Sequence, residues 1–252
     1  MAGRIAALYR HPIKGFTPQK VSAAFLETGR PFPGDRLWAV EDGPSGFDPE
    51  RPAHISKSRF AVLAKIPALA LARTDYDVET GELVARAPGL PEFREHMAGE
   101  WGKTAFAAWL EALLGEAASG PLKVLDGAGH RFLDSPEGHV SIINLASVRD
   151  FEARIGQPVD PLRFRANLYV NGWRPWEEND WIDRELAVGD VRVKVIQPIT
   201  RCAAPDVDPT TALADIEVTR RLHELYGHLW CGIYVQVTAP GRIAEGDEAR
   251  LL

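Results

Sequence analysis

Short apolar runs, many of them alternating with polar positions, recur along this chain of 252 residues. Alternation with a period of two predicts strands, because successive strand side chains point to opposite faces. The chain also carries 19 prolines and 22 glycines, which suit many short elements joined by turns. Strands are expected at residues 5–13, 20–27, 36–40, 122–125, 140–143, 163–170, 191–198, 229–238 and 249–252, with a hairpin over 71–87.

Three segments show helical signals instead. Residues 101–116 place apolar side chains at helical spacing, which predicts an amphipathic helix. Residues 147–156 begin with a Ser-x-x-Asp capping box and end at a glycine, and residues 217–226 are followed by Gly227. The chain is therefore expected to be mainly β with a few helices (α+β). A polar, proline-containing connection over 89–99 suggests two domains, residues 1–95 and 96–252.

Composition excludes several classes of protein. A net charge of −6 and a pI near 5.7 argue against a general nucleic-acid-binding surface. We expect no membrane span, because eighteen consecutive apolar residues never occur, and the first residues do not read as a secretory signal. Two cysteines make no disulfide framework, so a reduced, cytoplasmic setting is expected. No CxxC pair, Walker loop or GxGxxG sequence is present.

Cys202 is the first candidate for chemistry. It follows Thr200 and Arg201 in a short loop after a strand-like run, and a thiol beside a guanidinium suits a reactive or metal-ligating cysteine. The competing interpretation is that Cys202 is a small buried hydrophobic residue. Cys231 lies inside an apolar strand pattern and is expected in the core.

A second group of residues could bind an anion. On a strand over 163–170, Arg165 and Asn167 would share one face, and a guanidinium with an amide suits phosphate or carboxylate. Lys14, beside Gly15, and Arg36, at a turn, are further cations that a loop could bring to an anion. Taken singly, each of these cations is better explained as an ordinary exposed charge.

Several separated blocks of this sequence resemble the MOSC domain, named after the C-terminal domain of molybdenum cofactor sulfurases. The first block is GHVSIINLASVRDFEARIGQPVDPLRFRANLYVNG, and PWEENDW, IQPITRCAAPDVDP and APGRIAEGDEARLL follow in order. The front part, ALYRHPIKGFTPQKVSAAFLETGRPFPGDRLWAV, is similar to the N-terminal β-barrel domain that precedes MOSC in many of these proteins.

The resemblance implies two β-barrel-like domains framing one site for the molybdenum cofactor. In members similar to the mitochondrial amidoxime-reducing component, the cysteine of the R-C segment, here Cys202, ligates molybdenum. The resemblance assigns the cofactor's phosphate and ring to Lys14, Arg36, Arg165 and Asn167, with Thr200 and Arg201 beside the cysteine. It implies an oxidoreductase that reduces N-hydroxylated or N-oxygenated small molecules. Electrons would come from a separate donor protein of ferredoxin, flavoprotein or cytochrome type.

The sequence also departs from the family pattern. Gly15 stands where many relatives carry a hydroxyl or a cysteine, and Thr200 corresponds to a serine or proline-flanked position. No ferredoxin domain and no aminotransferase-like domain accompany these blocks, so neither a built-in electron donor nor cysteine desulfurase activity is expected. Two other hypotheses stay open, which are a non-catalytic carrier of the cofactor or its sulfur, and a thiol enzyme with Cys202 as nucleophile and His130 or His139 as base.

Overall fold

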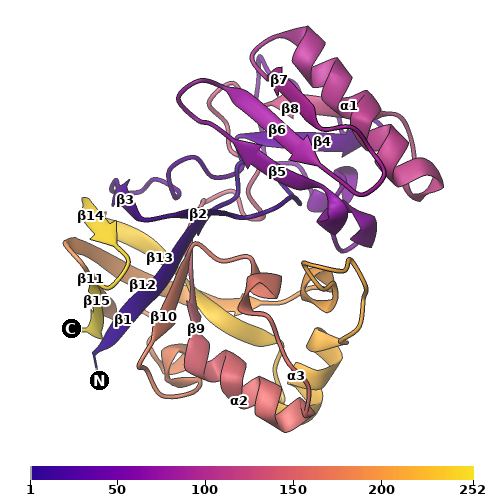
Figure 1. The fold of residues 1–252 in the computed structure, drawn as a ribbon. Coiled ribbons are helices and arrows are strands. Elements are labelled where there is room, and N and C mark those ends of the chain that lie inside the picture. Colours follow the sequence, from indigo (N-terminus) through magenta and orange to yellow (C-terminus); the bar gives the residue numbers. More distant parts are fainter. Residues whose placement is uncertain (1) are drawn as a thin grey trace.

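The computed structural model describes residues 2–252 and is mainly β with three α-helices, which confirms the predicted fold class. Seven strands form a closed barrel in the order β10-β9-β13-β12-β11-β15-β1, and pairing of β1 with β10 closes it (Figure 1). The barrel strands are β1 (Gly3–Arg10), β9 (Val140–Asn144), β10 (Leu168–Asn171), β11 (Glu185–Val188), β12 (Val191–Thr200), β13 (Trp230–Ala239) and β15 (Glu248–Leu251).

Some barrel strands, such as β12, bury alternate side chains, whereas all five residues of β9 are buried. In β12, Val191, Val193 and Val195 are buried, whereas Arg192 between them is exposed. The buried valines join apolar residues of β1, β9, β10 and β13 in one core. The first and last strands pair with each other, so both ends of the chain lie side by side (Figure 1). Short strands extend this half, namely β2 (Gln19–Val21), β3 (Ala23–Leu26) and β14 (Gly241–Ala244).

A second half, which we call the α1 unit (residues 38–126), lies above the barrel in Figure 1. Its strands are β4 (Trp38–Asp42) paired with β8 (Leu122–Asp126), and β5 (Arg73–Tyr76), β6 (Glu82–Arg86) and β7 (Phe93–His96). The predicted helix and hairpin are confirmed there. Helix α1 (Glu100–Leu114) buries Phe106 and Leu110 in a core with Phe93 of β7. The boundary drawn between residues 95 and 96 stays a prediction.

Two helices cover the opposite end of the barrel. Helix α2 (Leu145–Ile155) ends at Gly156 and α3 (Val218–Tyr226) at Gly227, both glycines in the left-handed conformation that the sequence predicts there. The predicted capping box is wrong, however. Asn144 caps α2 by accepting the backbone N–H of Ala146, so Ser147 lies inside the first turn.

The prediction of one alternating strand over 163–170 is also wrong. Asp160 accepts the backbone N–H of Leu162 and Pro161 follows it, and this pair starts a 3-10 turn that ends at Phe164. Arg165 then takes a left-handed conformation (φ 52°), and the strand begins only at Leu168. The full set of 3-10 helices is η1 (Lys57–Arg59), η2 (Pro67–Leu71), η3 (Gly115–Ala117), η4 (Pro161–Phe164), η5 (Glu177–Asp180) and η6 (Ala204–Asp206).

Both cysteines are free thiols in different surroundings. Cys231 is 1% exposed in the core against α2 and α3, as predicted, and burial raises the pKa of its thiol to about 12. Cys202 is half-buried in the loop after β12. Within residues 2–252, no helix is long and apolar enough to cross a membrane.

Candidate functional site

All seven residues singled out from the sequence line one cleft between the α1 unit and the barrel. Lys14 and Arg36 come from the loops that follow β1 and precede β4. Arg165 and Asn167 lie between η4 and β10, while Thr200, Arg201 and Cys202 come from the end of β12. Register shifts around Pro198 bend β12 before it reaches Thr200.

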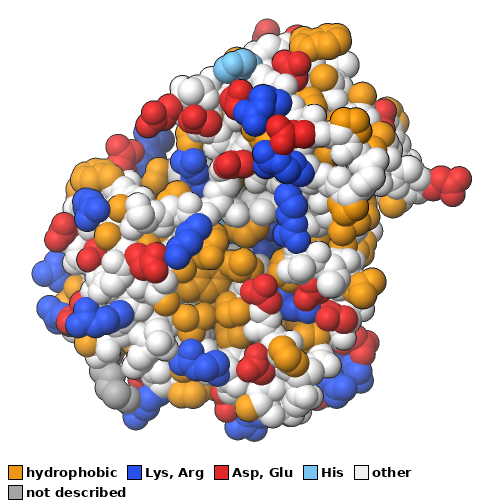
Figure 2. All heavy atoms as spheres, viewed as in Figure 1, with side chains coloured by type: hydrophobic (Ala, Val, Ile, Leu, Met, Phe, Trp, Pro, Cys, Tyr) orange, Lys and Arg blue, Asp and Glu red, His pale blue; other side chains and the backbone are white. Residues whose placement is uncertain are grey.

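The cleft is strongly basic although the chain is acidic overall. Six cationic side chains line it against only two carboxylates, Asp35 and Asp134. On the face shown in Figure 2, acidic and basic side chains are intermixed. Excess positive charge inside a concave site raises the local concentration of anions. The lining cations are Lys14, Arg36, Lys57, Arg163, Arg165 and Arg201.

Arg165 is the cation in this cleft whose donors are least used. Its Nη2 atom is buried and has no hydrogen-bond partner among residues 2–252. Burial, and then the nearby charge of Arg36, lowers the pKa of Arg165 to about 10. A buried guanidinium donor without an acceptor is costly, so this side chain is suited to an anionic ligand.

Arg36 belongs to a buried network around Asp35. The Asp35 carboxylate is 2% exposed and accepts hydrogen bonds from the backbone N–H of His11 (2.6 Å), from Asn167 Nδ2 (3.2 Å) and from Arg36 Nη1. Burial, and then Arg36, lowers the pKa of His11 to about 3, so its ring is neutral. Arg36 also contacts His11 Nδ1 (3.0 Å) and donates to the Arg165 carbonyl (3.4 Å). The network fixes Arg36 and the Arg165 backbone together.

The amide of Asn167 is used within the protein. Its Nδ2 donates to the Tyr9 carbonyl (3.2 Å) as well as to Asp35, and its Oδ1 accepts from the backbone N–H and the hydroxyl of Ser141 (3.1 and 2.9 Å). An amide has two N–H donors and one carbonyl acceptor with two lone pairs. Asn167 therefore lines the cleft as a residue that joins β9, β1 and Asp35.

Lys14 is a buried lysine, 4% exposed, that faces a loop carrying Asp134. Its ammonium donates to the Phe132 carbonyl (2.9 Å) and to Asp134 Oδ1 (2.5 Å). Burial lowers the pKa of Lys14, and Asp134 opposes that shift. Lys57 Nζ lies 3.9 Å from the other oxygen of Asp134.

Lys57 is also the cation that interacts with the Cys202 side chain. Burial lowers the pKa of Lys57, but Asp134 and then Cys202 outweigh it, so the pKa is raised. The guanidinium of Arg201 instead donates to the carbonyls of Cys231 (2.8 Å) and Phe164 (2.8 Å). Gly232 lies next to Arg201, and glycine is required there because its φ is +80° and a Cβ would meet the Ile142 carbonyl at 2.4 Å.

Profile models of two families match almost the whole chain. The model described as "MOSC domain" matches residues 129–250, and the model described as "MOSC N-terminal beta barrel domain" matches residues 2–117. The chain belongs to the MOSC-domain family. This confirms the resemblance seen in the sequence blocks.

Curated relatives match this MOSC protein over less than half of its length. Mitochondrial amidoxime-reducing component 1 of Mus musculus is 32% identical over 123 residues, which cover 44% of this chain and 36% of that protein. Molybdenum cofactor sulfurase of Homo sapiens is 38% identical over 63 residues, covering 25% of this chain and 7% of that protein. Among solved structures, the YUAD protein of Bacillus subtilis aligns with a TM-score of 0.46 at 14% identity, over 99% of this chain and 94% of that one.

The departure of this MOSC protein at Gly15 has a packing explanation. Gly15 has a φ of +87°, and a Cβ at this position would meet the Ala61 carbonyl oxygen at 2.8 Å. A residue with a side chain would require the backbone of residues 61 and 62 to move. The close approach of this loop to residues 61 and 62 therefore requires glycine.

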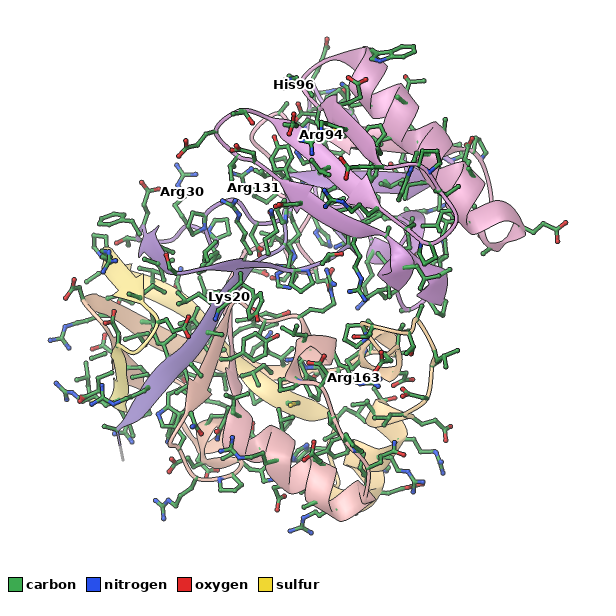
Figure 3. All side chains as sticks on the ribbon, in the orientation of Figure 1. Lys20, Arg30, Arg94, His96, Arg131 and Arg163 are labelled. Carbon is green, nitrogen blue, oxygen red and sulfur yellow. The ribbon has the colours of Figure 1, made fainter. Side chains whose placement is uncertain are left out.

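Arg163 is one of the site residues that sequence reasoning missed. It is 3% exposed, is labelled in Figure 3, and donates to the carbonyls of Pro205 (3.3 Å) and Asp206 (3.1 Å) and to Asp208 Oδ2 (3.0 Å). A further ion pair joins it to Asp215 (2.8 Å). These bonds hold the segment that follows Cys202. The sequence did contain a signal for this role, because several aspartates follow Cys202 and a buried arginine could pair with them.

The other missed residues are Asp35, His11 and Asp134, which contact the predicted cations Arg36 or Lys14, and Lys57, which lies near Asp134 and Cys202. Lone loop residues such as Lys57 and Asp134 carry no spacing signal, because only the closure of the cleft brings them to Lys14 and Cys202. Within residues 2–252, no three His, Cys, Asp or Glu side chains converge as metal ligands. The donor set present, one thiol among several cations, fits an anionic group that brings most of its own metal ligands.

Proposed function

We propose that this protein binds the molybdenum cofactor in the cleft and uses it to reduce N-hydroxylated or N-oxygenated small molecules. The proposal rests on one observation. The half-buried thiol of Cys202 and the buried Arg165 Nη2, which lacks an acceptor among residues 2–252, line the same cleft. A soft sulfur ligand suits a molybdenum centre, and a guanidinium suits the cofactor's phosphate. The name of the molybdenum cofactor sulfurase relative supports the cofactor, and the name of the amidoxime-reducing relatives supports the reaction.

The residues take distinct roles in this proposal. Cys202 Sγ would be the protein ligand to the metal, and Lys57 interacts with this side chain. Arg165, Lys14 and Arg36 hold the anionic part of the cofactor, with Thr200 and Arg201 beside the cysteine. Asn167 acts by fixing Asp35 and so the orientation of Arg36. When bound, the cofactor supplies two-electron oxygen-atom chemistry, and the protein supplies binding and orientation.

The proposed reaction balances with an external reductant. An N-hydroxylated substrate takes up two electrons and two protons, its N–O bond breaks, and the products are the amine or amidine and water. The electrons come from a separate protein of the ferredoxin, flavoprotein or cytochrome class. We propose that the reaction takes place in the cytoplasm, the setting expected from the sequence.

Molybdenum analysis of protein from a cofactor-competent host tests the proposal. Wild type should carry molybdenum and reduce benzamidoxime with an artificial one-electron reductant. Cys202→Ala should lose the activity, and Cys231→Ala is the matched control because that thiol is buried elsewhere. Wild type without molybdenum, or Cys202→Ala with full activity, would refute the proposal.

A carrier of the cofactor or its sulfur is the second candidate. It is supported by the exposure of the side chains beside Cys202, since Lys57 is 41% and Asp134 54% exposed, which leaves a route for transfer. The carrier predicts bound molybdopterin with no turnover of benzamidoxime or hydroxylamine under the same reductant. Turnover under those conditions would exclude a purely carrier role.

A further inference from the structure

We propose that Asp134 is an affinity-determining residue of the cleft, an internal anion that occupies the place of a ligand's phosphate and must leave when the phosphate binds. The inference deepens the proposed function and rests on it in one respect, that the natural ligand presents a phosphate monoester. The competition itself concerns any phosphate-like anion and does not require a metal.

The contacts of Asp134 are those that an anionic ligand would make. One carboxylate oxygen accepts from the buried Lys14 ammonium at 2.5 Å, and the other lies 3.9 Å from Lys57 Nζ. Both lysines line the cleft together with Arg165, whose Nη2 has no partner within residues 2–252. The two lysines therefore face one carboxylate, in a cleft that Arg165 also lines, and a dianion could bind in its place.

Asp134 differs from Asp35, the other carboxylate of the cleft, in how firmly it is held. Asp35 is 2% exposed and accepts three hydrogen bonds from His11, Asn167 and Arg36. Asp134 is 54% exposed, and Lys14 is its only hydrogen-bond donor among the described residues. Burial raises the pKa of Asp134, but Lys14 and then Lys57 outweigh it and lower the pKa to about 2, so its carboxylate is attracted to these lysines. A half-exposed carboxylate regains hydration when it turns outward, so its displacement costs less than that of Asp35.

The loop that carries Asp134 can move without opening a core. Phe132 anchors one end, being 3% exposed and packed against Phe60, and strand β9 begins at Val140. Between these points Ser135, Pro136 and Glu137 are half-buried or exposed. Phosphate binding is therefore coupled to outward rotation of Asp134, while the Phe132 carbonyl keeps its bond to Lys14.

Calorimetric titration with inorganic phosphate at pH 8 tests the inference on three proteins, namely wild type, Asp134→Asn and Glu137→Gln. Asp134→Asn removes the competing charge and should bind phosphate about tenfold more tightly than wild type. Glu137→Gln makes the same change of net charge in the same loop, and Glu137 has no ion pair within residues 2–252. It should change the affinity less than twofold.

Hydrogen–deuterium exchange gives a second measurement. Phosphate should speed exchange of the backbone over residues 133–138 in wild type, whereas Asp134→Asn should exchange fast there without phosphate. The inference would be overturned if wild type and Asp134→Asn bound phosphate with equal affinity, or if Asp134→Asn and Glu137→Gln gained affinity equally. It would also be overturned if none of the three proteins bound phosphate. Molybdenum content judges the proposed function separately, so the two can fail independently.

Discussion

Arg163 and Arg165 are two residues apart, yet the Nη atoms of Arg163 have protein partners, whereas Arg165 Nη2 has none among residues 2–252. The Nη atoms of Arg163 bond to two carbonyls and two carboxylates of the segment 205–215. Nη2 of Arg165 has no partner among the described residues, and Arg36 lies close enough to lower its pKa. The comparison shows that a buried cation with partners fixes a loop, whereas one without partners leaves binding capacity for a ligand.

Removal of Arg163 should give the largest effect on stability. Arg163→Met leaves the Pro205 carbonyl without a donor, removes one of the two donors to the Asp206 carbonyl, and leaves Asp208 and Asp215 without their cation. We expect a loss of about 3 kcal/mol in the free energy of unfolding, measured by urea denaturation. Arg220→Met is the matched control. It breaks exposed ion pairs on α3 with Glu217 and Glu224 and should leave the free energy of unfolding nearly unchanged. Equal losses in both variants would contradict a special role of Arg163.

The sequence predicted the elements whose signal is local. Helix α1 and the hairpin β5–β6 follow from spacing within one segment, and the glycines after α2 and α3 mark their ends. The segment around Arg165 was mispredicted because alternating polar residues resemble a strand. The cap formed by Asp160 and Pro161 instead favours a turn. In this case local turn chemistry outweighed the period of the pattern.

The site was predictable only in part, for the same reason. Lys14, Arg36, Arg165 and Cys202 stand in recognisable blocks, and the cleft does bring them together. Arg36 has its counter-charge in the adjacent Asp35, but other polar partners in the site come from distant segments. Asp134 is 120 positions from Lys14, and Asn167 is 132 positions from Asp35. Such pairs exist only once the chain has folded, so no spacing within the sequence could have indicated that the amide of Asn167 is already used.

Glu178 is a buried acid and differs from the two buried arginines. A carboxylate can become neutral by binding a proton, whereas an arginine side chain stays charged. The carboxyl is 0% exposed, and Asn144 Nδ2 and Ser147 Oγ donate to it at 2.7 and 2.8 Å. Burial outweighs these bonds and raises the pKa of Glu178 to about 7. The folded state therefore binds the extra proton at pH values where the unfolded chain has released it, so stability is lost as the pH rises from about 4.5 to about 7.

Glu178→Gln should remove this pH dependence. Its amide reproduces the neutral acid, with the carbonyl oxygen facing Asn144 and the NH₂ facing the Ser147 hydroxyl. At pH 8 the variant should be more stable than wild type by about 3 kcal/mol, and at pH 4.5 the difference should nearly vanish. Urea unfolding at both values measures this. A variant equally destabilised at both would mean that Glu178 is held as a carboxylate.

Of the three side chains replaced here, Arg165 should affect the free energy of unfolding least. Its replacement should instead weaken phosphate binding. Arg165→Met keeps the length of the side chain and its apolar contacts, and removes a charge that Arg36 repels and burial disfavours. We expect the free energy of unfolding to rise by up to about 1 kcal/mol, opposite in sign to the Arg163→Met effect. Phosphate affinity should fall about tenfold, because a charge-assisted hydrogen bond contributes about 1.5 kcal/mol or more. Arg165→Lys keeps the charge but loses the fork, so it should recover part of the affinity. A destabilised Arg165→Met protein that binds phosphate normally would place Arg165 with Arg163 among the structural arginines.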